Sequence, residues 1–317
     1  MNGNTALVRS DRYRLHETGH HPENARRLIA IDERLASARL LDGRIVREPD
    51  AATPADIELV HDPGYVREIA ELAASGGGYL DADTHVGPES YATALLAAGG
   101  AMLGVDLVLS GAAPRAFVLP RPPGHHAERE QGMGFCLFNN VAIAARHSLA
   151  RHGLRRVAIV DWDVHHGNGT QDAFYDSDQV LFISLHQWPL YPGTGRPAEL
   201  GVDAGYGFTL NLPLPPGSDD KDYLTIFDEI VGPRLAEFAP ELILVSAGYD
   251  GHRDDPLAMM QLTEAGFAGM ATRVRRWADE LAGGRLVGVL EGGYNLKALA
   301  AGVEATLRAW DQPEEAP

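Results

Sequence analysis

Residues 157–169 read Val-Ala-Ile-Val-Asp-Trp-Asp-Val-His-His-Gly-Asn-Gly, a short apolar run followed at once by two aspartates and two histidines. The apolar part, Val157–Val160, has the length and composition of a buried strand. In extended backbone alternate residues share a face, so Asp161, Asp163 and His165 point one way and can converge on a cation. Two carboxylates and an imidazole on one face, with no basic residue nearby, would repel each other without a counter-charge. The segment therefore predicts a metal site at the end of a strand.

Outward from this segment, short apolar runs alternate with longer stretches of helical composition, the pattern of a parallel sheet with crossover helices. The expected strands are Ala116–Leu119, Val157–Val160, Val180–Leu185, Phe208–Leu212, Leu242–Val245 and Leu286–Leu290. The expected helices are Ala25–Ala38, Tyr91–Leu109, Val141–Arg151, Tyr223–Phe238, Thr263–Leu281 and Leu296–Trp310. We therefore predict an α/β fold with a central, mostly parallel sheet flanked by helices. No boundary between two halves is visible, so we predict a single domain over residues 1–317.

Two further loops after expected strands carry groups suited to hydrolysis. Asp250, after Leu242–Val245, is a candidate third ligand, which would complete an open site of three protein groups plus water. Taken alone, an aspartate between tyrosine and glycine is more often a turn residue. His125 and His126, after Ala116–Leu119, lie on a proline-rich loop and have the side chain suited to proton transfer near neutral pH. Histidine pairs also occur as ordinary surface residues, and His20-His21 is interpreted in that way.

A fourth loop follows Leu286–Leu290 and contains Gly292, Gly293 and Tyr294. The glycines allow close approach of the backbone to a ligand, and the tyrosine hydroxyl is a hydrogen-bond donor suited to a developing oxyanion. By itself this signal is weak, because a glycine pair before a helix is more often a simple helix entry.

Composition narrows the class of protein. Of the 317 residues, 45% are hydrophobic and 22% charged, an ordinary globular balance. The net charge of −17 disfavours nucleic-acid binding and either favours cationic substrates or only aids solubility. The single cysteine, Cys136, excludes an intramolecular disulfide and agrees with a reducing compartment. Met1–Ser10 lacks an apolar run and Gln312–Pro317 is acidic, so we expect no signal peptide, no membrane span and a cytoplasmic location.

Five separated segments, in order, resemble the histone deacetylase superfamily, which includes acetylpolyamine amidohydrolases. They are Arg121–Asn140, Val157–Asp172, Phe182–Gly195, Leu244–Leu257 and Val289–Leu296. The forms Asp-Trp-Asp-Val-His-His-Gly-Asn-Gly-Thr and Leu-Glu-Gly-Gly-Tyr-Asn look like the class II and bacterial branch. The resemblance implies the arginase/deacetylase-like fold and hydrolysis of a linear N-acyl amide to a carboxylate and an amine.

The resemblance also implies a set of bound ions. Asp163, His165 and Asp250 would hold one catalytic ion, zinc by default, although such ligands also accept iron(II), cobalt or manganese. A structural potassium ion would be coordinated by Asp161, Asp163, His165, Ser184 and Leu185, largely through carbonyl oxygens. A second alkali-ion site would use Phe174, Ser177, Val180 and Phe208.

Catalytic roles follow from the same resemblance. His126 would be the general base, His125 with Asp161 behind it would assist the leaving amine, and Tyr294 would polarise the carbonyl. Asn168 stands where class I relatives place an aspartate behind the second histidine. An amide cannot stabilise an imidazolium by charge, so we expect His126 to stay neutral at lower pH than it would with a carboxylate behind it. The alternative is that Asn168 only supports the loop.

Residues of an acyl-lysine tunnel are implied as well. Phe135 and Tyr191 match its aromatic walls, with core packing as the alternative for both, and Gly134 matches the residue whose carbonyl receives the substrate amide. Leu257 occupies the rim position where a polyamine-specialised relative has a glutamate. This favours an acyl-lysine peptide or a neutral acyl amide over a polyamine, although Asp254 or Glu23 could supply charge there instead.

Two competing classes are less favoured. A binuclear manganese ureohydrolase of the arginase type needs a further aspartate where this chain has Gly248. A non-catalytic acyl-lysine binder would tolerate loss of the base or the tyrosine, whereas His125, His126 and Tyr294 are all present. The expected partner is an acylated lysine peptide or a small acyl amide, and a homo-oligomer is left open.

Overall fold

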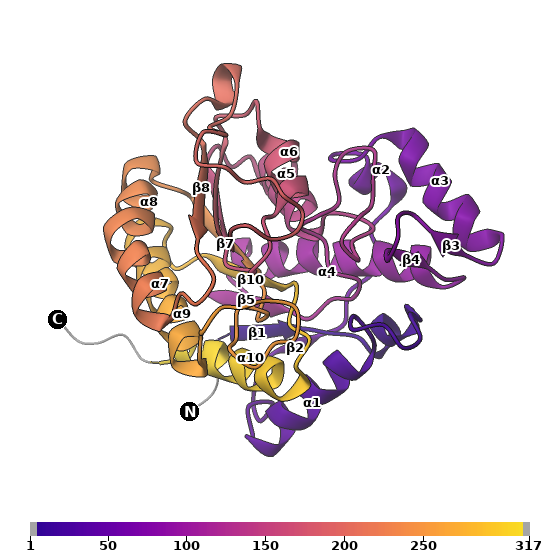
Figure 1. The fold of residues 1–317 in the computed structure, drawn as a ribbon, viewed down its shortest axis with the longest axis horizontal. Coiled ribbons are helices and arrows are strands. Elements are labelled where there is room, and N and C mark those ends of the chain that lie inside the picture. Colours follow the sequence, from indigo (N-terminus) through magenta and orange to yellow (C-terminus); the bar gives the residue numbers. More distant parts are fainter. Residues whose placement is uncertain (1–4, 313–317) are drawn as a thin grey trace.

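A computed structural model describes residues 5–312 and builds them around an eight-stranded sheet (Figure 1). The strands are β1 Thr5–Val8, β2 Val46–Arg47, β5 Arg115–Val118, β6 Val157–Asp161, β7 Val180–Gln187, β8 Thr209–Leu214, β9 Leu242–Ala247 and β10 Leu286–Leu290. Their order is β2-β1-β5-β10-β9-β6-β7-β8, and every neighbouring pair is parallel. The predicted α/β class is confirmed, with a wholly parallel main sheet over these residues. Expectations for residues 1–4 and 313–317 fall outside the described residues.

All six expected strands occur, each within two residues of the predicted bounds. The sequence did not indicate β1 and β2, nor a small antiparallel pair formed by β3 Gly78–Tyr79 and β4 His85–Val86. β2, β3 and β4 are two residues long, too short for a periodic signal. β1 has four residues near the chain end and becomes buried only because β5 and β2 pair with it.

The helices are α1 Arg26–Ser37, α2 Pro54–Ile57, α3 Pro63–Ala74, α4 Ser90–Leu109, α5 Asn140–His152, α6 Asn168–Phe174, α7 Asp220–Ile226, α8 Gly232–Phe238, α9 Glu264–Leu281 and α10 Leu296–Trp310. The sequence did not predict α2, α3 or α6. The expected helix Tyr223–Phe238 is interrupted between α7 and α8 by a π-helical turn, Phe227–Val231. Pro233 is the second residue after this turn and has no N–H for a regular helical hydrogen bond, so the helix changes its hydrogen-bond spacing before it.

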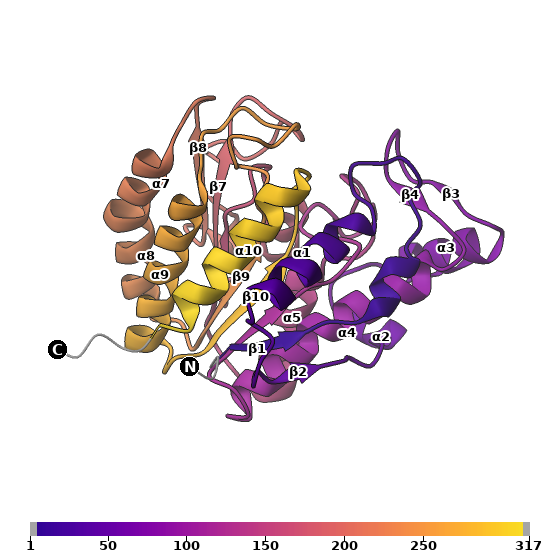
Figure 2. The same cartoon turned by 90° about the horizontal axis from the view of Figure 1, so that it is seen from below.

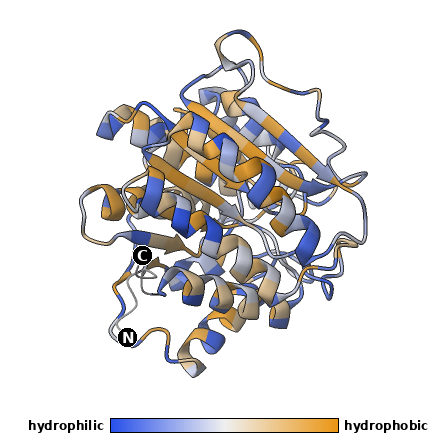
Figure 3. Cartoon of the chain, turned by 90° about the vertical axis from the view of Figure 1, so that its left-hand side faces the viewer, coloured by the Kyte–Doolittle hydropathy of each residue, from blue (hydrophilic) through white to orange (hydrophobic). Residues whose placement is uncertain are grey.

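Helices cover both faces of the sheet (Figure 2). One layer contains α1, α7, α8, α9 and α10, and the other contains α2 to α6. Successive residues of β6 alternate between two buried clusters: Ala158 and Val160 join one, Val157 and Ile159 the other. Because both faces are buried, the strands are continuous hydrophobic runs, which Figure 3 shows beneath helices of mixed hydropathy.

The helix α4 is long and apolar enough to cross a membrane by length and composition, but 61% of its most apolar window is buried inside the fold. A Cβ atom added at Gly104 would lie 2.9 Å from side-chain carbons of both Val118 and Val287. The helix therefore packs on the sheet at a distance that only glycine permits at this position, as a core helix does.

We predict that Gly104→Leu lowers the free energy of unfolding by about 1–3 kcal/mol or more, because the new side chain overpacks the contact between α4 and the sheet. Urea denaturation followed by circular dichroism measures the change. The matched control is Ala92→Leu, which adds a leucine at an exposed position of the same helix. Equal denaturation midpoints for the two variants would contradict this account of the packing.

Candidate active site

Four adjacent strands bring the polar loops together. β5, β10, β9 and β6 are neighbours in the sheet in that order, and they precede the four loops singled out in the sequence. Because the strands are parallel, their carboxyl ends lie at one edge, where open α/β sheets bind ligands. Residues from four distant parts of the chain therefore meet at this edge.

Asp163, His165 and Asp250 form a compact cluster there. The Nδ1 atom of His165 lies 3.2 Å from Oδ1 of Asp163 and 3.2 Å from Oδ2 of Asp250. Candidate ligand atoms from all three residues lie within 4.8 Å of one another, and all three side chains are buried or nearly so. The alternation of side chains along a strand predicted that Asp161 would point the same way as Asp163 and His165. The side chain of Asp161 does not join the cluster, because the strand β6 ends at Asp161 and the alternation ends with it. Its Oδ2 lies 3.0 Å from Nδ1 of His125.

Backbone N–H groups hold the two carboxylates in place. Asp163 accepts hydrogen bonds from Gly292 N (2.8 Å) and His165 N (2.9 Å), and Asp250 accepts one from Val164 N (2.9 Å). These donors fix the orientation of the carboxylate oxygens and offset part of the cost of burying charge.

The electrostatics of the cluster demand positive charge. Burial alone would raise the pKa of Asp163, but the charge of His125 and the hydrogen bonds from His165 outweigh burial and hold that pKa well below its usual range. Burial and the charge of Asp163 raise the pKa of Asp250. Burial would lower the pKa of His165, but hydrogen bonds to the two carboxylates raise it to about 10. Two carboxylates and an imidazole around one point fit a zinc-type ion.

Two glycines leave no room for a second set of ligands. A Cβ atom added at Gly248 would lie 2.1 Å from Oδ2 of Asp163, and one added at Gly292 would lie 2.1 Å from Oδ2 of Asp250. An aspartate cannot occupy position 248 without moving the ligand cluster. The geometry thus disfavours the binuclear arginase-type site, as the sequence did.

The two adjacent histidines differ in their partners. His125 contacts the Asp161 carboxylate and its Nε2 lies 3.7 Å from Asp163, whereas Nδ1 of His126 lies 2.8 Å from Oδ1 of Asn168. Burial would lower the pKa of His125, but the charges of Asp163 and Asp161 raise it to about 10. Burial and the charges of His125 and His165 lower the pKa of His126 well below its usual value. The pair therefore combines a protonated and a neutral imidazole near neutral pH.

Sequence reasoning missed the role of Glu291. Its Oε2 accepts hydrogen bonds from Gly124 N (2.7 Å) and His125 N (3.2 Å), which ties the histidine loop to the end of β10. Burial raises the pKa of this carboxyl to about 7. A glutamate directly after a buried strand was the available signal, because such a side chain needs buried donors.

The backbone around Tyr294 is held by groups on other segments. Asp255, also missed, accepts hydrogen bonds from Tyr294 N (2.7 Å) and Asn295 N (3.1 Å). The guanidinium of Arg27 lies over the tyrosine ring, 5.1 Å from its centroid, and Nε of Arg27 donates to Gly293 O (2.7 Å). Burial raises the pKa of the Tyr294 hydroxyl well above its usual value, so this group stays a hydrogen-bond donor.

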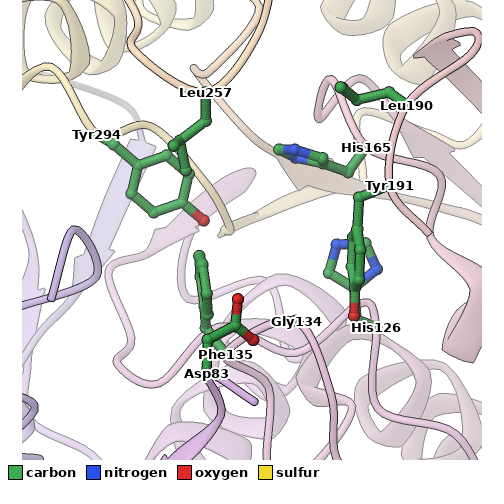
Figure 4. Close-up of a pocket in the computed structure, with 9 residues that line it drawn as sticks. All are labelled: Asp83, His126, Gly134, Phe135, His165, Leu190, Tyr191, Leu257 and Tyr294. Atoms are coloured by element: carbon green, nitrogen blue, oxygen red, sulfur yellow. The ribbon is translucent and has the colours of Figure 1, made fainter. Parts of the chain in front are cut away.

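A cavity of about 240 Å³ leads to these groups (Figure 4). Its lining residues are Asp83, His126, Gly134, Phe135, His165, Leu190, Tyr191, Leu257 and Tyr294. Tyr294 and Tyr191 extend from opposite sides, and the Tyr294 hydroxyl points inward. All four residues predicted for the tunnel, Gly134, Phe135, Tyr191 and Leu257, line the cavity, so Phe135 and Tyr191 are wall residues.

Several rim residues differ from the sequence interpretation. His21, interpreted as an ordinary surface residue, packs edge-to-face on Phe135 with 4.4 Å between ring centroids. Glu23 cannot supply charge at the rim, because it is fully buried and paired with Arg121 and Arg27. The acidic lining residue is Asp83 instead, which no motif indicated, since its segment reaches the cavity only through the tertiary fold.

The segments predicted to bind alkali ions are also brought together. Ser184 of β7 pairs in register with Asp161 of β6, next to Leu185. In the second set, Ser177 N donates to Phe174 O (3.0 Å), and Phe182 N donates to the carbonyl of Phe208 (2.9 Å). Val180 begins β7 beside them. The assignment of potassium to these carbonyls stays a prediction.

A parallel α/β sheet that gathers one set of candidate metal ligands and a histidine pair beside a cavity is an arrangement suited to hydrolysis. The family model described as histone deacetylase domain matches residues 21–310. The chain belongs to the histone deacetylase family, as its motifs predicted.

Individual proteins agree with this assignment. The chain is 46% identical over 276 residues to a histone deacetylase-like amidohydrolase of Pseudomonas aeruginosa, covering 86% of this chain and 72% of that one. It is 41% identical over 301 residues to polyamine deacetylase HDAC10 of Homo sapiens, covering 90% of this chain and 44% of that one. The crystal structure of the HDA15 HD domain superposes with a TM-score of 0.91 at 37% identity, covering 96% and 90% of the two chains.

We predict that Asp250→Asn removes tight zinc binding at this edge of the sheet, because an amide oxygen is a neutral and weaker ligand. The expected loss exceeds the roughly 10- to 100-fold that follows loss of a hydrogen-bond partner behind a ligand. Competition with a chromophoric chelator measures the affinity, and Asp254→Asn, an exposed neighbour, is the control. Unchanged affinity in Asp250→Asn would rule out this ligand set.

Proposed function

We propose that this protein is a metal-dependent deacylase that hydrolyses the side-chain amide of an acylated lysine in a peptide or protein. The main support for the proposal is the set of side chains that line one cavity. A neutral histidine, a candidate metal ligand and a tyrosine hydroxyl line its interior, and aromatic side chains form its walls. These groups suffice for addition of water to an amide held between the walls.

Asp163, His165 and Asp250 would hold the ion. A bound zinc ion supplies Lewis-acid polarisation of the amide carbonyl and lowers the pKa of water. Its native identity stays open, with zinc as the default and iron(II) or cobalt as alternatives that the same donors accept. Gly248 and Gly292 keep the space around these carboxylates clear of further side chains.

His126 is proposed as the general base. Its Nδ1 donates to Oδ1 of Asn168, so Nε2 is left as the proton acceptor. As the oxygen of water bonds to the carbonyl carbon, one proton passes to Nε2 of His126. A neutral imidazole is required for this step, and burial together with the charge of His125 keeps His126 neutral.

His125 and Tyr294 serve the later stages. The Tyr294 hydroxyl donates to the carbonyl oxygen as negative charge develops there. The bond between carbonyl carbon and nitrogen then breaks as the amine nitrogen takes the proton that Nε2 of His126 accepted, and the protonated His125 assists departure of the amine by stabilising the negative charge on the carbonyl oxygen. The products are a carboxylate and a protonated amine, so atoms and protons balance with water as the only co-reactant.

Of the residues that line the cavity, Leu257 favours an acylated lysine over a polyamine as the substrate, and Asp83 is the carboxylate that can bind a cationic group. Leu257 lines the cavity, and its apolar side chain cannot pair with a distant ammonium group of a polyamine. Gly134 and Phe135 both have positive φ angles, +54° and +71°, which turn the wall segment into the cavity. The carbonyl of Gly134 is the proposed acceptor for the substrate amide N–H.

A small acetylated polyamine is the second candidate, and Asp83 favours it. This carboxylate lies on the cavity wall, where it can pair with a cation or accept an N–H group of a peptide. A relative named as a polyamine deacetylase shares 41% identity with this chain. A binder of acyl-lysine without turnover is the third, and the complete set of His125, His126 and Tyr294 argues against it.

We further propose a cytoplasmic enzyme that contacts neither nucleic acid nor membranes. The single cysteine, Cys136, is buried and free, which suits a reducing compartment. The net charge of −17 opposes binding to phosphate backbones and to anionic membranes alike.

Hydrolysis of an acetyl-lysine peptide and of N-acetylputrescine should be compared with the zinc-loaded protein. We expect higher kcat/KM for the peptide, and a roughly 100- to 1000-fold lower kcat in Tyr294→Phe because an oxyanion donor is lost. The control is Tyr206→Phe, at an exposed tyrosine outside the cavity. A preference for N-acetylputrescine would show that the substrate is a polyamine and not an acylated lysine. No turnover of either compound would favour a protein that binds acyl-lysine without hydrolysing it.

We predict that Asn168→Asp moves the acidic limb of kcat/KM to higher pH. A carboxylate beside Nδ1 stabilises the imidazolium and raises the pKa of His126, so the neutral base is lost at a higher pH than in the wild type. The pH–rate profile between pH 5 and 8 measures the shift, with Gln261→Glu as the exposed control. An unmoved limb would show that Asn168 only supports the loop.

A further inference from the structure

A second cluster of candidate ligands lies at the opposite edge of the sheet. It consists of Asp106 on α4 and of His147 and His152 on α5. Both Nε2 atoms lie 2.7 Å from the same oxygen, Oδ1 of Asp106, and all three candidate ligand atoms lie within 4.8 Å of one another. Since α4 leads into β5 and α5 leads into β6, the cluster lies at the amino ends of those strands. None of these residues touches the catalytic cavity.

The electrostatic field around Asp106, His147 and His152 favours the binding of a cation. His152 is the last residue of α5, and Asp106 lies in the last turn of α4, which ends at Leu109. The carboxyl ends of two helices therefore meet at the cluster, and each carries partial negative charge from its free carbonyl groups. The Asp106 carboxylate adds a full negative charge. Asp106 and His152 are open to solvent while His147 is buried, so an ion has both an entry path and a fixed ligand.

The donor set is that of a zinc-type ion. Two imidazole nitrogens and one carboxylate oxygen leave a fourth position for water, and ligands about 2.1 Å from a tetrahedral ion lie roughly 3.4 Å apart. The observed separation between Oδ1 and each Nε2 is 2.7 Å. Each Nε2 thus needs to move about 0.7 Å farther from Oδ1 of Asp106 to admit an ion in place of the two hydrogen bonds.

We propose that Asp106, His147 and His152 bind a zinc-type divalent cation as a second, non-catalytic metal site that joins α4 to α5. Nδ1 of His147 is buried without a hydrogen-bond partner among the described residues, whereas backbone N–H groups support the ligands at the catalytic edge. Ligands that lack such support bind metals more weakly. The second site therefore fills after the catalytic one.

The bound ion would act on the helix pair. α5 begins at the catalytic edge, where Nδ2 of Asn140 donates to the carbonyl of Pro122 (3.1 Å) in the histidine loop. A metal clamp at the other end of α5 would hold the helix that supports this loop against α4. The clamp stabilises the fold and contributes no group to the reaction.

Zinc binding by the full chain tests the proposal, with Asp250→Asn used to remove the catalytic site. Equilibrium dialysis against free zinc should give two ions per chain for the wild type, one for Asp250→Asn, one for His152→Ala and none for Asp250→Asn with His152→Ala. We also expect zinc to raise the Tm of Asp250→Asn but not that of the double variant. His20→Ala, at another exposed histidine, is the control and should keep two ions.

Equal zinc binding by Asp250→Asn and the double variant would overturn the proposal. Asp106→Asn provides an independent, conservative change, and it should lose the same ion as His152→Ala while keeping its circular dichroism spectrum. Retention of both ions in Asp106→Asn would also refute the site.

Discussion

The burial of three carboxylates side by side is the constraint on which the structure of this site depends. Asp161, Asp163 and Asp250 are fully buried at the carboxyl ends of adjacent strands, where isolated charges would cost several kcal/mol each. Backbone N–H groups, His125 and His165 surround them, and the proposed divalent cation would complete the balance of charge. The charges of Asp163 and Asp161 raise the pKa of His125, and burial with the charge of His125 lowers the pKa of His126, so one electrostatic arrangement gives the charged and the neutral histidine of the proposed reaction.

Parallel strand pairing makes this arrangement possible. Four neighbouring strands deliver their following loops to one edge, and glycines at positions 248 and 292 let those loops pack against the carboxylates. The supporting side chains come from elsewhere: Glu291 holds the histidine loop and Asp255 holds the backbone of Tyr294. The residues proposed to take part in the reaction and the residues that hold them in place thus come from different segments of the chain. The short motifs alone therefore do not describe the site.

The two candidate metal clusters, one at each edge of the sheet, differ in how the protein holds their ligands. At the carboxyl edge the ligands are buried and each carboxylate receives backbone hydrogen bonds. At the amino edge Asp106 and His152 are partly open, and helix ends supply most of the favourable field. The same residue types therefore lead to different proposed roles, catalysis at one edge and a link between helices at the other, because their surroundings differ.

The sequence by itself determined the α/β class, six strands of the sheet, the catalytic and metal-binding candidates and the histone deacetylase family, because strand periodicity and contiguous motifs are local properties. The tertiary structure decided the wholly parallel sheet, the short strands β1 and β2, and the interruption between α7 and α8. It also decided the places of Asp83, His21 and Glu23, and the meeting of Asp106 with His147 and His152. These features depend on contacts between residues far apart in the chain, for which neither periodicity nor spacing carries a signal.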